Sequence, residues 1–187
     1  PLGILIDFGV VVRSPMPLTL AGVADVISNQ SAVKDWILAN KNIGEPINEL
    51  AFMLAKSAPV PLFEYSKEDL DKDEFLYDLA SGLILSGMSM MMTGNSRGAS
   101  GSEHLISHAI DEYFPEKSTI HGIQVGWAHL MVEKYCRKDE DEYNRLKAFF
   151  DRIGLTEIMN ESVMWKEEEF MNLIPYAKTI RKRYTIF

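Results

Sequence analysis

The sequence predicts a mainly α-helical, bundle-like domain that is preceded by one or two β-strands. Three observations lead to this prediction. The chain has 187 residues, 47% of them apolar, which is enough to bury one core. The run GILIDFGVVV at residues 3–12 is apolar and β-branched, as buried strands are. From residue 16 onward, apolar residues recur almost throughout with helical spacing.

The first part of the chain divides at its prolines. The strand run ends at RSPMP, where two prolines interrupt regular structure. A helical region follows over residues 18–40, and its apolar stripe contains Leu20, Val23, Ile27, Val33, Trp36 and Ile37. Residues 46–58 predict another helix with Pro46 in its first turn, where proline is tolerated. Residues 66–94 predict a long acidic-to-apolar helix or helix pair.

The second part of the chain predicts four more helices. Ser100 followed by Glu103 has the spacing of a capping box, so a helix is expected to start at Ser100. Helical spacing also covers residues 121–137, 139–153 and 166–183, which brings the total to about seven helices after the strands. Two strands alone do not make a stable sheet, so we expect them to be the end of a preceding α/β domain.

Charge and composition exclude several classes of function. The net charge of −8 argues against nonspecific binding to nucleic acid or to an anionic membrane surface. The most apolar stretch, residues 83–92, is too short to span a bilayer. Cys136 is the only cysteine, so no internal disulfide forms, and a reducing cytoplasm is expected. The one basic cluster, residues 181–183, fits a surface helix end as well as a phosphate site.

Two histidines stand four residues apart on one predicted helix face. His104 lies in the first turn, where the helix dipole disfavours the imidazolium and so favours the neutral, ligating form. His108 follows one turn later. The preceding loop TGNSRGASG is rich in glycine and serine, which lets a ligand approach the backbone. His121 begins another apolar helix, and Gly122 permits close packing there.

A metal site built on these histidines needs an acidic partner. A catalytic zinc ion takes three protein ligands and leaves one position open, and His104 and His121 supply two. Asp25 interrupts the apolar stretch AGVADVI, where a buried, unpaired aspartate is costly. On the residues alone, a solvated aspartate and a chance pair of surface histidines remain alternatives.

Other residues whose side chains could react or bind a metal have simpler explanations. His129 lies in an apolar helix and is expected to be structural. The methionines of residues 88–92 are contiguous rather than spaced as ligands, so they are expected to pack the core, as are the three tryptophans.

Four segments together resemble the sn-glycerol-1-phosphate dehydrogenases, within the larger group of iron-type alcohol dehydrogenases, glycerol dehydrogenases and dehydroquinate synthases. The segments are AGVADVISNQSAVKDW, SRGASGSEHLISHAID, HGIQVG and IRKRYTIF. The resemblance covers essentially the whole chain and implies a C-terminal helical domain with one catalytic metal, usually zinc, with iron or nickel as alternatives. It assigns the metal ligands to Asp25, His104 and His121. It places His108 beside the nicotinamide and substrate, as the catalytic residue.

The resemblance also implies a second domain. The family binds NAD or NADP on an N-terminal α/β domain, whereas this chain has neither G-x-G-x-x-G nor G-x-x-x-x-G-K-[ST]. We therefore expect residues 1–15 to be the strand remnant of that nucleotide-binding domain and residues 16–187 to be the helical metal-binding catalytic domain. The chain is then a fragment or the product of a split gene, and its activity alone stays open. A homo-oligomer or a separate nucleotide-binding chain is expected as partner.

The resemblance implies the C-terminal metal-binding half of a cytoplasmic NAD(P)-dependent polyol-phosphate dehydrogenase, in which zinc polarises the hydroxyl or ketone of a small polyol or polyol-phosphate substrate for hydride transfer. Phospholipid biosynthesis is the implied pathway. Departures from the family pattern leave the substrate open. Asn29 stands where iron-type enzymes have a further ligand histidine, which favours zinc. Gly98 replaces a proline and Ile123 replaces an acid.

Two other functions remain open: a related glycerol dehydrogenase-like enzyme with another substrate, and a non-catalytic helical metal-binding module. In the loop before His104, Ser100 and the backbone amides of residues 97–102 are candidates to contact substrate or phosphate. Arg97 is a candidate phosphate partner, with a solvated surface charge as the alternative.

Overall fold

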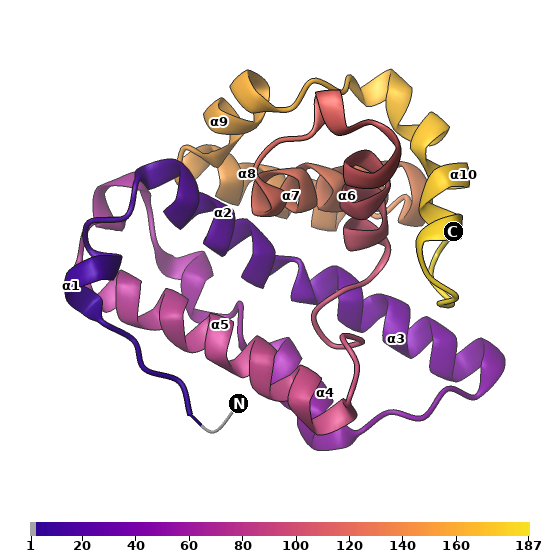
Figure 1. Cartoon of the computed structure of the whole chain (residues 1–187), viewed down its shortest axis with the longest axis horizontal. Helices are drawn as coiled ribbons and strands as arrows, with labels where there is room; N and C mark the ends of the chain where they lie inside the picture. The colour runs from indigo at the N-terminus through magenta and orange to yellow at the C-terminus, as the bar shows by residue number, and fades with distance from the viewer. Residues whose placement is uncertain (1–2) are drawn as a thin grey trace.

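The computed structural model describes residues 3–187, and all regular structure in that range is helical (Figure 1). The mainly α-helical class predicted from the sequence is therefore confirmed. In chain order the α-helices are α1 (Phe8–Val11), α2 (Met16–Ile27), α3 (Asn29–Ile43), α4 (Glu49–Ser57), α5 (Asp73–Thr93), α6 (Ser102–Tyr113), α7 (His121–Met131), α8 (Glu140–Arg152), α9 (Leu155–Ser162) and α10 (Phe170–Ile180). Short 3₁₀ turns lie at Pro61–Glu64, Lys67–Asp69, Pro115–Lys117 and Glu167–Glu169, and Val132–Arg137 continues α7 as a wider π-type turn.

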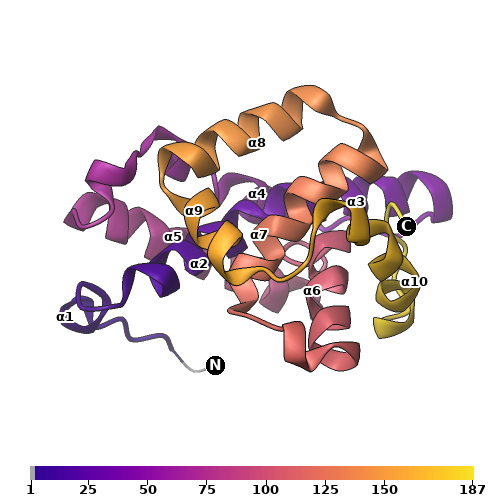
Figure 2. The same cartoon turned by 90° about the horizontal axis from the view of Figure 1, so that it is seen from above.

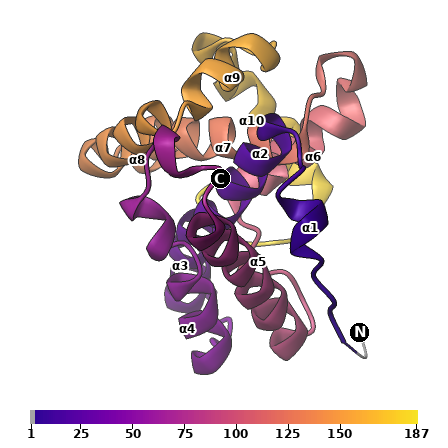
Figure 3. The same ribbon diagram turned by 90° about the vertical axis from the view of Figure 1, so that its left-hand side faces the viewer.

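The helices form two groups on either side of a central rod. Helices α2 and α3 run end to end through the middle, with α4 and α5 on one side and the later helices on the other (Figures 1 and 3). Helix α2 packs against both α5 and α7, and α6 packs against α7 and α10. Helices α8 and α9 follow one another outside α7 (Figure 2). The core therefore has α2 at its centre, and residues of α2, α6 and α7 can share one site.

The central rod is divided at Ser28, between α2 and α3. The sequence predicts a single helical region over residues 18–40, and the structure divides it there. Ser28 keeps helical dihedral angles, but its hydroxyl donates to the carbonyl oxygen of Asp25 at 2.7 Å. Such a bond from serine to the preceding turn competes with the helical hydrogen bond. The division lies one turn after Asp25.

The expected strands at residues 3–12 are absent. Residues 3–7 have no regular structure, and Phe8–Val11 form a short helix, α1, capped by Asp7, which accepts a hydrogen bond from the amide of Gly9 at 2.9 Å. Phe8 packs on Tyr77 of α5, with ring centroids 4.0 Å apart. A strand needs a neighbouring strand to form hydrogen bonds with its backbone, and no segment of residues 3–187 forms such a strand. Residues 1 and 2 of the expected strand remnant lie outside the described residues.

Two helix boundaries also differ from the predictions. Pro46 does not enter α4, because Asn48 caps that helix by accepting from the amide of Ala51 at 3.0 Å. The last helix was expected to reach residue 183, but it ends at Ile180, and residues 181–187 follow it without helical structure. Arg181 has an extended backbone at φ −147° and ψ 143°. Helix α9 had not been predicted as a separate helix.

Helix α5 is long and apolar enough to cross a membrane by length and composition, the one such helix within residues 3–187. It has 21 residues, with a mean hydropathy of 1.3 over the best window, of which 33% is buried in the structure. One such helix is weak evidence, because core helices of soluble proteins meet the same criterion.

Candidate metal centre

Three side chains from three helices meet where α2, α6 and α7 converge. Asp25 lies on α2, His104 in the first turn of α6, and His121 at the first position of α7. One ligand atom from each lies within 4.8 Å of the other two. The Oδ1 atom of Asp25 is 3.1 Å from Nε2 of His104, and the His104 and His121 rings are 5.1 Å apart between centroids. The structure thus brings together the three residues that the sequence had nominated as metal ligands.

Two glycines let α7 approach α2 closely enough for this meeting. A Cβ atom on Gly122 would lie 2.1 Å from the carbonyl oxygen of Ala21, and one on Gly126 would lie 2.9 Å from the Cβ of Ala24. No larger residue fits at either position without moving the helices apart. The close packing that the sequence suggested after His121 is therefore present, and it sets the distance between His121 and Asp25.

The two histidines are held in the same way. Nδ1 of His104 is 2.9 Å from Oε1 of Glu103, and Nδ1 of His121 is 3.0 Å from the hydroxyl of Ser107. With Nδ1 engaged, each imidazole has its Nε2 atom left to bind a ligand. Metal-binding histidines are commonly fixed by such a partner on the other ring nitrogen, which sets the tautomer and the ring orientation.

The electrostatics of the centre favour a cation. Burial of His104 opposes its protonation, but hydrogen bonds to the carboxylates of Asp25 and Glu103 outweigh that effect and raise its pKa to about 9. Burial also opposes ionisation of Glu103, yet its contacts with His104 lower the pKa of its carboxyl to about 2. The side chains therefore draw a positive charge to a buried position. Two imidazoles and a carboxylate suit zinc and other first-row metals, so the residues fit the metal that the resemblance implies.

A second group of potential ligands shares His121. One atom each from His108, Asp111 and His121 also lies within 4.8 Å of the others. Asp111 is exposed, and its Oδ1 atom already accepts hydrogen bonds from Ser118 at 2.6 Å and Gln124 at 3.0 Å. Asp25 has no such competing side-chain donors besides His104 within residues 3–187. The Asp25 group is therefore the better candidate.

His108 lies beside the candidate ligands without being one of the three. Its ring is 6.1 Å from that of His104 and stacks on that of His121 at 5.4 Å, between centroids. Burial and the positive charges of His104 and Arg181 lower the pKa of His108 to about 4. Its imidazole is therefore neutral near pH 7, with an Nε2 atom that accepts hydrogen bonds.

A pocket of about 270 Å³ opens on this group. Its lining includes the candidate ligands Asp25 and His104, together with Asn29, Ser86, Leu83, Met90, Ser96, Ala99, Ser100, His108 and Arg181. Ligand pockets in proteins commonly measure about 300–1,000 Å³, so this one suits a small molecule. The side-chain amide of Asn29 donates to Ser86 at 2.6 Å and to the carbonyl oxygen of Ala55 at 3.2 Å, and thus serves structure at the pocket wall.

The loop before His104 differs from the predicted capping box. Helix α6 is capped at Gly101 rather than at Ser100, and the carboxylate of Glu103 accepts from the amide of Gly101 at 2.6 Å. The hydroxyl of Ser100 is buried and has no hydrogen-bond partner among residues 3–187. Arg97, proposed from the sequence as a phosphate partner, is 1% exposed and pairs with Glu45 at 2.6 Å. It does not line the pocket.

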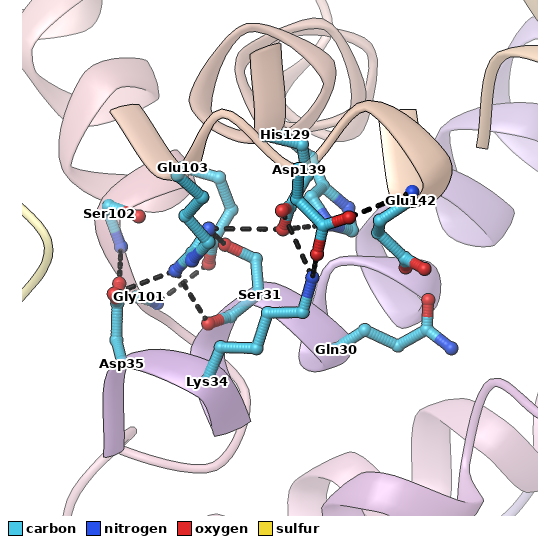
Figure 4. Close-up of polar contacts among 12 residues, drawn as sticks. Gln30, Ser31, Lys34, Asp35, Gly101, Ser102, Glu103, His129, Asp139 and Glu142 are labelled. Atoms are coloured by element: carbon cyan, nitrogen blue, oxygen red, sulfur yellow. Dashed lines mark hydrogen bonds and ion pairs between the residues drawn. The ribbon is translucent and has the colours of Figure 1, made fainter. Parts of the chain in front are cut away.

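A buried polar network that includes residues of α3 contacts the start of α6 (Figure 4). Asp35 of α3 accepts from the amide of Ser102 at 2.7 Å, and Arg137 donates to the other oxygen of Asp35 at 2.7 Å. Arg137 also donates to Glu133 at 3.1 Å, and fully buried His129 lies 3.5 Å from the same carboxylate. Asp35, Glu133 and Arg137 hold the backbone that presents Glu103 and His104.

The sequence reasoning missed this network, although weak signals were present. Asp35 stands next to Trp36 in an otherwise apolar helical stripe, where an unpaired acid is costly. Glu133 and Arg137 are one helical turn apart, as paired charges on a helix are. Neither signal says which acid meets which base. The expectation that His129 is structural agrees with its place in the network.

Comparison with known proteins agrees with the predicted resemblance. No family model matches the chain. The whole chain is similar to glycerol-1-phosphate dehydrogenases [NAD(P)+], at 35% identity for that of Haloquadratum walsbyi, 34% for that of Methanosphaera stadtmanae and 31% for that of Archaeoglobus fulgidus. The chain covers 53%, 53% and 54% of these relatives, so it spans about half the length of each. The resemblance to this family is confirmed.

Proposed function

We propose that this chain, a relative of the glycerol-1-phosphate dehydrogenases, is the metal-binding half of an NAD(P)-dependent polyol-phosphate dehydrogenase. The observation that carries the proposal is the convergence of Asp25, His104 and His121 from three helices at the edge of a small pocket. The relatives at 31–35% identity are named as NAD(P)-dependent enzymes, which supports the same class of cofactor here.

We propose zinc as the metal, with iron or nickel as the alternatives to be tested. Three protein ligands leave a position open for substrate, as in catalytic zinc sites. Asn29, at the position where a fourth protein ligand would stand in an iron-type enzyme, is committed to Ser86 and Ala55. The donor set therefore stays at three, which supports zinc over iron.

A metal bound at this centre acts as a Lewis acid that favours the alkoxide of an alcohol and polarises the corresponding ketone. The residues of this chain orient the substrate and handle its proton. His108, one helical turn from His104, is proposed to accept the hydroxyl proton at Nε2 and return it in the reverse direction. Its depressed pKa keeps the imidazole unprotonated and makes it a weak base, so His108 would accept the proton only from a hydroxyl made more acidic by a metal held at Asp25, His104 and His121. The hydride belongs to the nicotinamide cofactor, for which the protein supplies position and charge.

The nicotinamide cofactor needs a further domain in this proposal. The sequence holds no glycine-rich phosphate-binding loop, and the relatives are about twice as long as the chain. We propose that an α/β nucleotide-binding domain, on the same polypeptide or on a partner chain, covers the pocket in the active protein. A cytoplasmic location is part of the proposal, because NAD(P) and phosphorylated polyols are available there.

Metal content tests the proposal most directly. The purified chain is loaded with zinc, iron(II) or nickel, dialysed, and measured by inductively coupled plasma mass spectrometry. We expect about one equivalent of zinc in the wild type, less than a tenth of that in H104A and H121A, and wild-type content in H129A if that variant folds. H108A is the matched control, since it removes a neighbouring imidazole that is not a ligand. Equal zinc in wild type, H104A and H121A contradicts the site.

A second experiment tests the reaction. The chain joined to its nucleotide-binding domain is assayed with NADH or NADPH and dihydroxyacetone phosphate, and in parallel with dihydroxyacetone. Cofactor oxidation with the phosphate alone supports the proposal. Oxidation with dihydroxyacetone alone supports the glycerol dehydrogenase-like alternative. Zinc binding without oxidation of either substrate supports a non-catalytic metal-binding module.

A further inference from the structure

A second pocket is lined by the later half of α7, by α8 and α9, and by the segment that leads from α9 to α10. Its volume is about 280 Å³, and it shares no lining residue with the pocket at the candidate metal ligands. Helices α8 and α9 follow one another on this side of α7 (Figure 2). The apolar part of its wall includes Trp127, Leu130, Met131, Tyr143, Met159 and Trp165. Two of the three tryptophans of the chain therefore border one small space.

The chain after α9 carries Trp165 into this pocket. Val163 and Lys166 have extended backbone angles, with ψ of 115° and 156°. Side chains alternate between the two sides of an extended segment. Met164 is accordingly 54% exposed, whereas Trp165 is 8% exposed and lines the pocket. The burial of this indole thus follows from the extended backbone between α9 and α10.

The indole N–H of Trp165 has no acceptor. Its Nε1 atom is buried and makes no hydrogen bond within residues 3–187, whereas the N–H of Trp36 donates to the carbonyl oxygen of Pro46 at 3.1 Å. Buried donors without a partner are rare, because they lose their hydration and gain nothing in return. Neighbours on the ring itself, Phe114 at 5.0 Å between centroids and the Lys117 ammonium at 4.1 Å from the centroid, hold the indole in place. The pocket therefore offers a fixed donor to its occupant.

The charge at the pocket favours an anion. Two charged residues of its lining are already paired, Lys147 with Asp151 at 2.9 Å and Glu167 with Lys134. Lys166 also lines the pocket, and no carboxylate oxygen of residues 3–187 lies within 4.0 Å of its ammonium group. One free ammonium and one N–H suit a monoanion with two acceptor oxygens, whereas a phosphate dianion would keep one charge uncompensated.

We propose that this pocket binds a small aromatic carboxylate, which is a ligand distinct from the substrate of the metal centre. The ring of the ligand packs against Trp127 and Tyr143, because aromatic rings attract one another in offset and edge-to-face arrangements. Its carboxylate accepts a hydrogen bond from Nε1 of Trp165 and faces the ammonium of Lys166. A cavity of about 280 Å³ admits a molecule of roughly one or two rings. The inference requires neither a bound metal nor a nucleotide-binding domain.

The indole N–H signals of the ¹⁵N-labelled chain test the proposal by NMR titration with benzoate. The three tryptophans give three such signals, and Trp165→Phe identifies the signal of Trp165 by its loss. We expect benzoate to shift the Trp165 signal and to leave that of Trp36 in place, because the Trp36 N–H already has an acceptor. Benzamide lacks the charge and cyclohexanecarboxylate lacks the aromatic ring, so each should bind more weakly than benzoate, benzamide by about tenfold.

Three variants relate binding to single side chains. Trp165→Phe keeps an aromatic ring but removes the N–H, and should weaken benzoate binding about tenfold. Lys166→Gln should weaken it by about two- to fivefold, as expected for an exposed charge. Lys178→Gln is the matched control, since it removes an exposed lysine of α10 outside the pocket, and it should have no effect. Both lysines are exposed, so these variants keep the test decisive if Trp165→Phe does not fold.

The contrary outcomes are equally distinct. A Trp165 signal that stays in place as benzoate is added would overturn the site. Equal binding of benzoate and benzamide, or equal effects of Lys166→Gln and Lys178→Gln, would overturn the anionic class of ligand. Cyclohexanecarboxylate that binds as tightly as benzoate would overturn the aromatic class.

Discussion

The protein holds two clusters of histidine and carboxylate, and they differ in what balances the negative charge. In the buried network beside the start of α6, Arg137 donates to both Asp35 and Glu133, so each acid has a guanidinium partner. At the candidate metal centre, no lysine or arginine nitrogen of residues 3–187 lies within 4.0 Å of Asp25. In the first cluster every carboxylate is paired with a cation. In the second, the carboxylate of Asp25 and one ring nitrogen each of His104 and His121 face one another. Residue type alone does not distinguish a ligand site from a structural network; the absence of a lysine or arginine partner within residues 3–187 does.

The largest effect is expected from opening the closed cluster. Arg137→Leu leaves buried Asp35 without its cation and leaves Glu133 with Lys34 alone, 3.0 Å away, and breaking a buried pair in this way costs about 3–5 kcal/mol. Urea unfolding of the metal-free chain measures the change. Lys147→Ala, which removes an exposed pair with Asp151, is the control and should cost less than about 1 kcal/mol. A loss below 1 kcal/mol for Arg137→Leu would show that the network is not a closed structural unit.

A somewhat smaller effect is expected from separating the helices at the metal centre. In Gly122→Ala the new methyl group meets the carbonyl oxygen of Ala21, and such overpacking costs about 1–3 kcal/mol. Because α7 must move away from Asp25, zinc affinity should fall as well. Gly87→Ala on α5 is the control, since no atom lies within 4 Å of its added Cβ. Unchanged zinc affinity in Gly122→Ala would mean that the contact does not set the site's geometry.

A third change touches the contact that links the two clusters. Glu103→Gln keeps the shape of the side chain but removes the charge that holds Nδ1 of His104. Loss of such a supporting partner typically lowers metal affinity about 10–100-fold. Competition with a coloured chelator measures the affinity, and circular dichroism checks that the fold persists. Ser107→Ala is the parallel test at His121. Wild-type zinc affinity in Glu103→Gln would show that the charge of Glu103 does not support His104 as a ligand.

The smallest change, for a step of one pH unit, is expected from pH. Zinc must displace the proton from His104, whose pKa is raised to about 9, while the pKa values of His108 and His121 are lowered. Apparent zinc affinity should therefore fall about tenfold for each pH unit below 9, equivalent to about 1.4 kcal/mol. Chelator competition between pH 7 and 9 measures it. A flat profile over that range would contradict a protonated His104.

The metal-free chain should show the opposite trend in stability. A folded-state pKa above the ordinary value of 6.5 contributes stability that is fully present below pH 6.5 and lost as pH rises through about 9. The difference in thermal stability between the zinc-loaded and the chelator-treated chain should therefore grow as pH rises over the same interval. The titrating residue, His104, lies outside the network of Asp35, Glu133 and Arg137. Arg137→Leu should therefore leave this pH dependence of stability in place.

The sequence located the candidate site less well than the resemblance did. The residues alone nominated His104, His121 and Asp25 as ligands, but left a solvated aspartate and a chance pair of surface histidines as alternatives. Only the matching of four separate segments to a family assigned these three residues together and set His108 apart from them. The basic residue at the pocket was harder still to predict: Arg97 lies in the expected loop, yet it is buried against Glu45, and Arg181 reaches the pocket from the far end of the chain.

Local sequence determined the helical class of this protein and most of its helices, because periodic apolar residues, caps such as Asn48 and Asp139, and proline positions act within a few residues. Local sequence did not predict features that depend on contact with a distant part of the chain. A β-branched run becomes a strand only if another strand pairs with it, so residues 3–12 could not be assigned locally. The meeting of Asp25 with His104 and His121, and of Asp35 with Arg137, depends on helices packed from distant parts of the chain. Tertiary structure alone decides which charges find a partner and which are left facing a pocket.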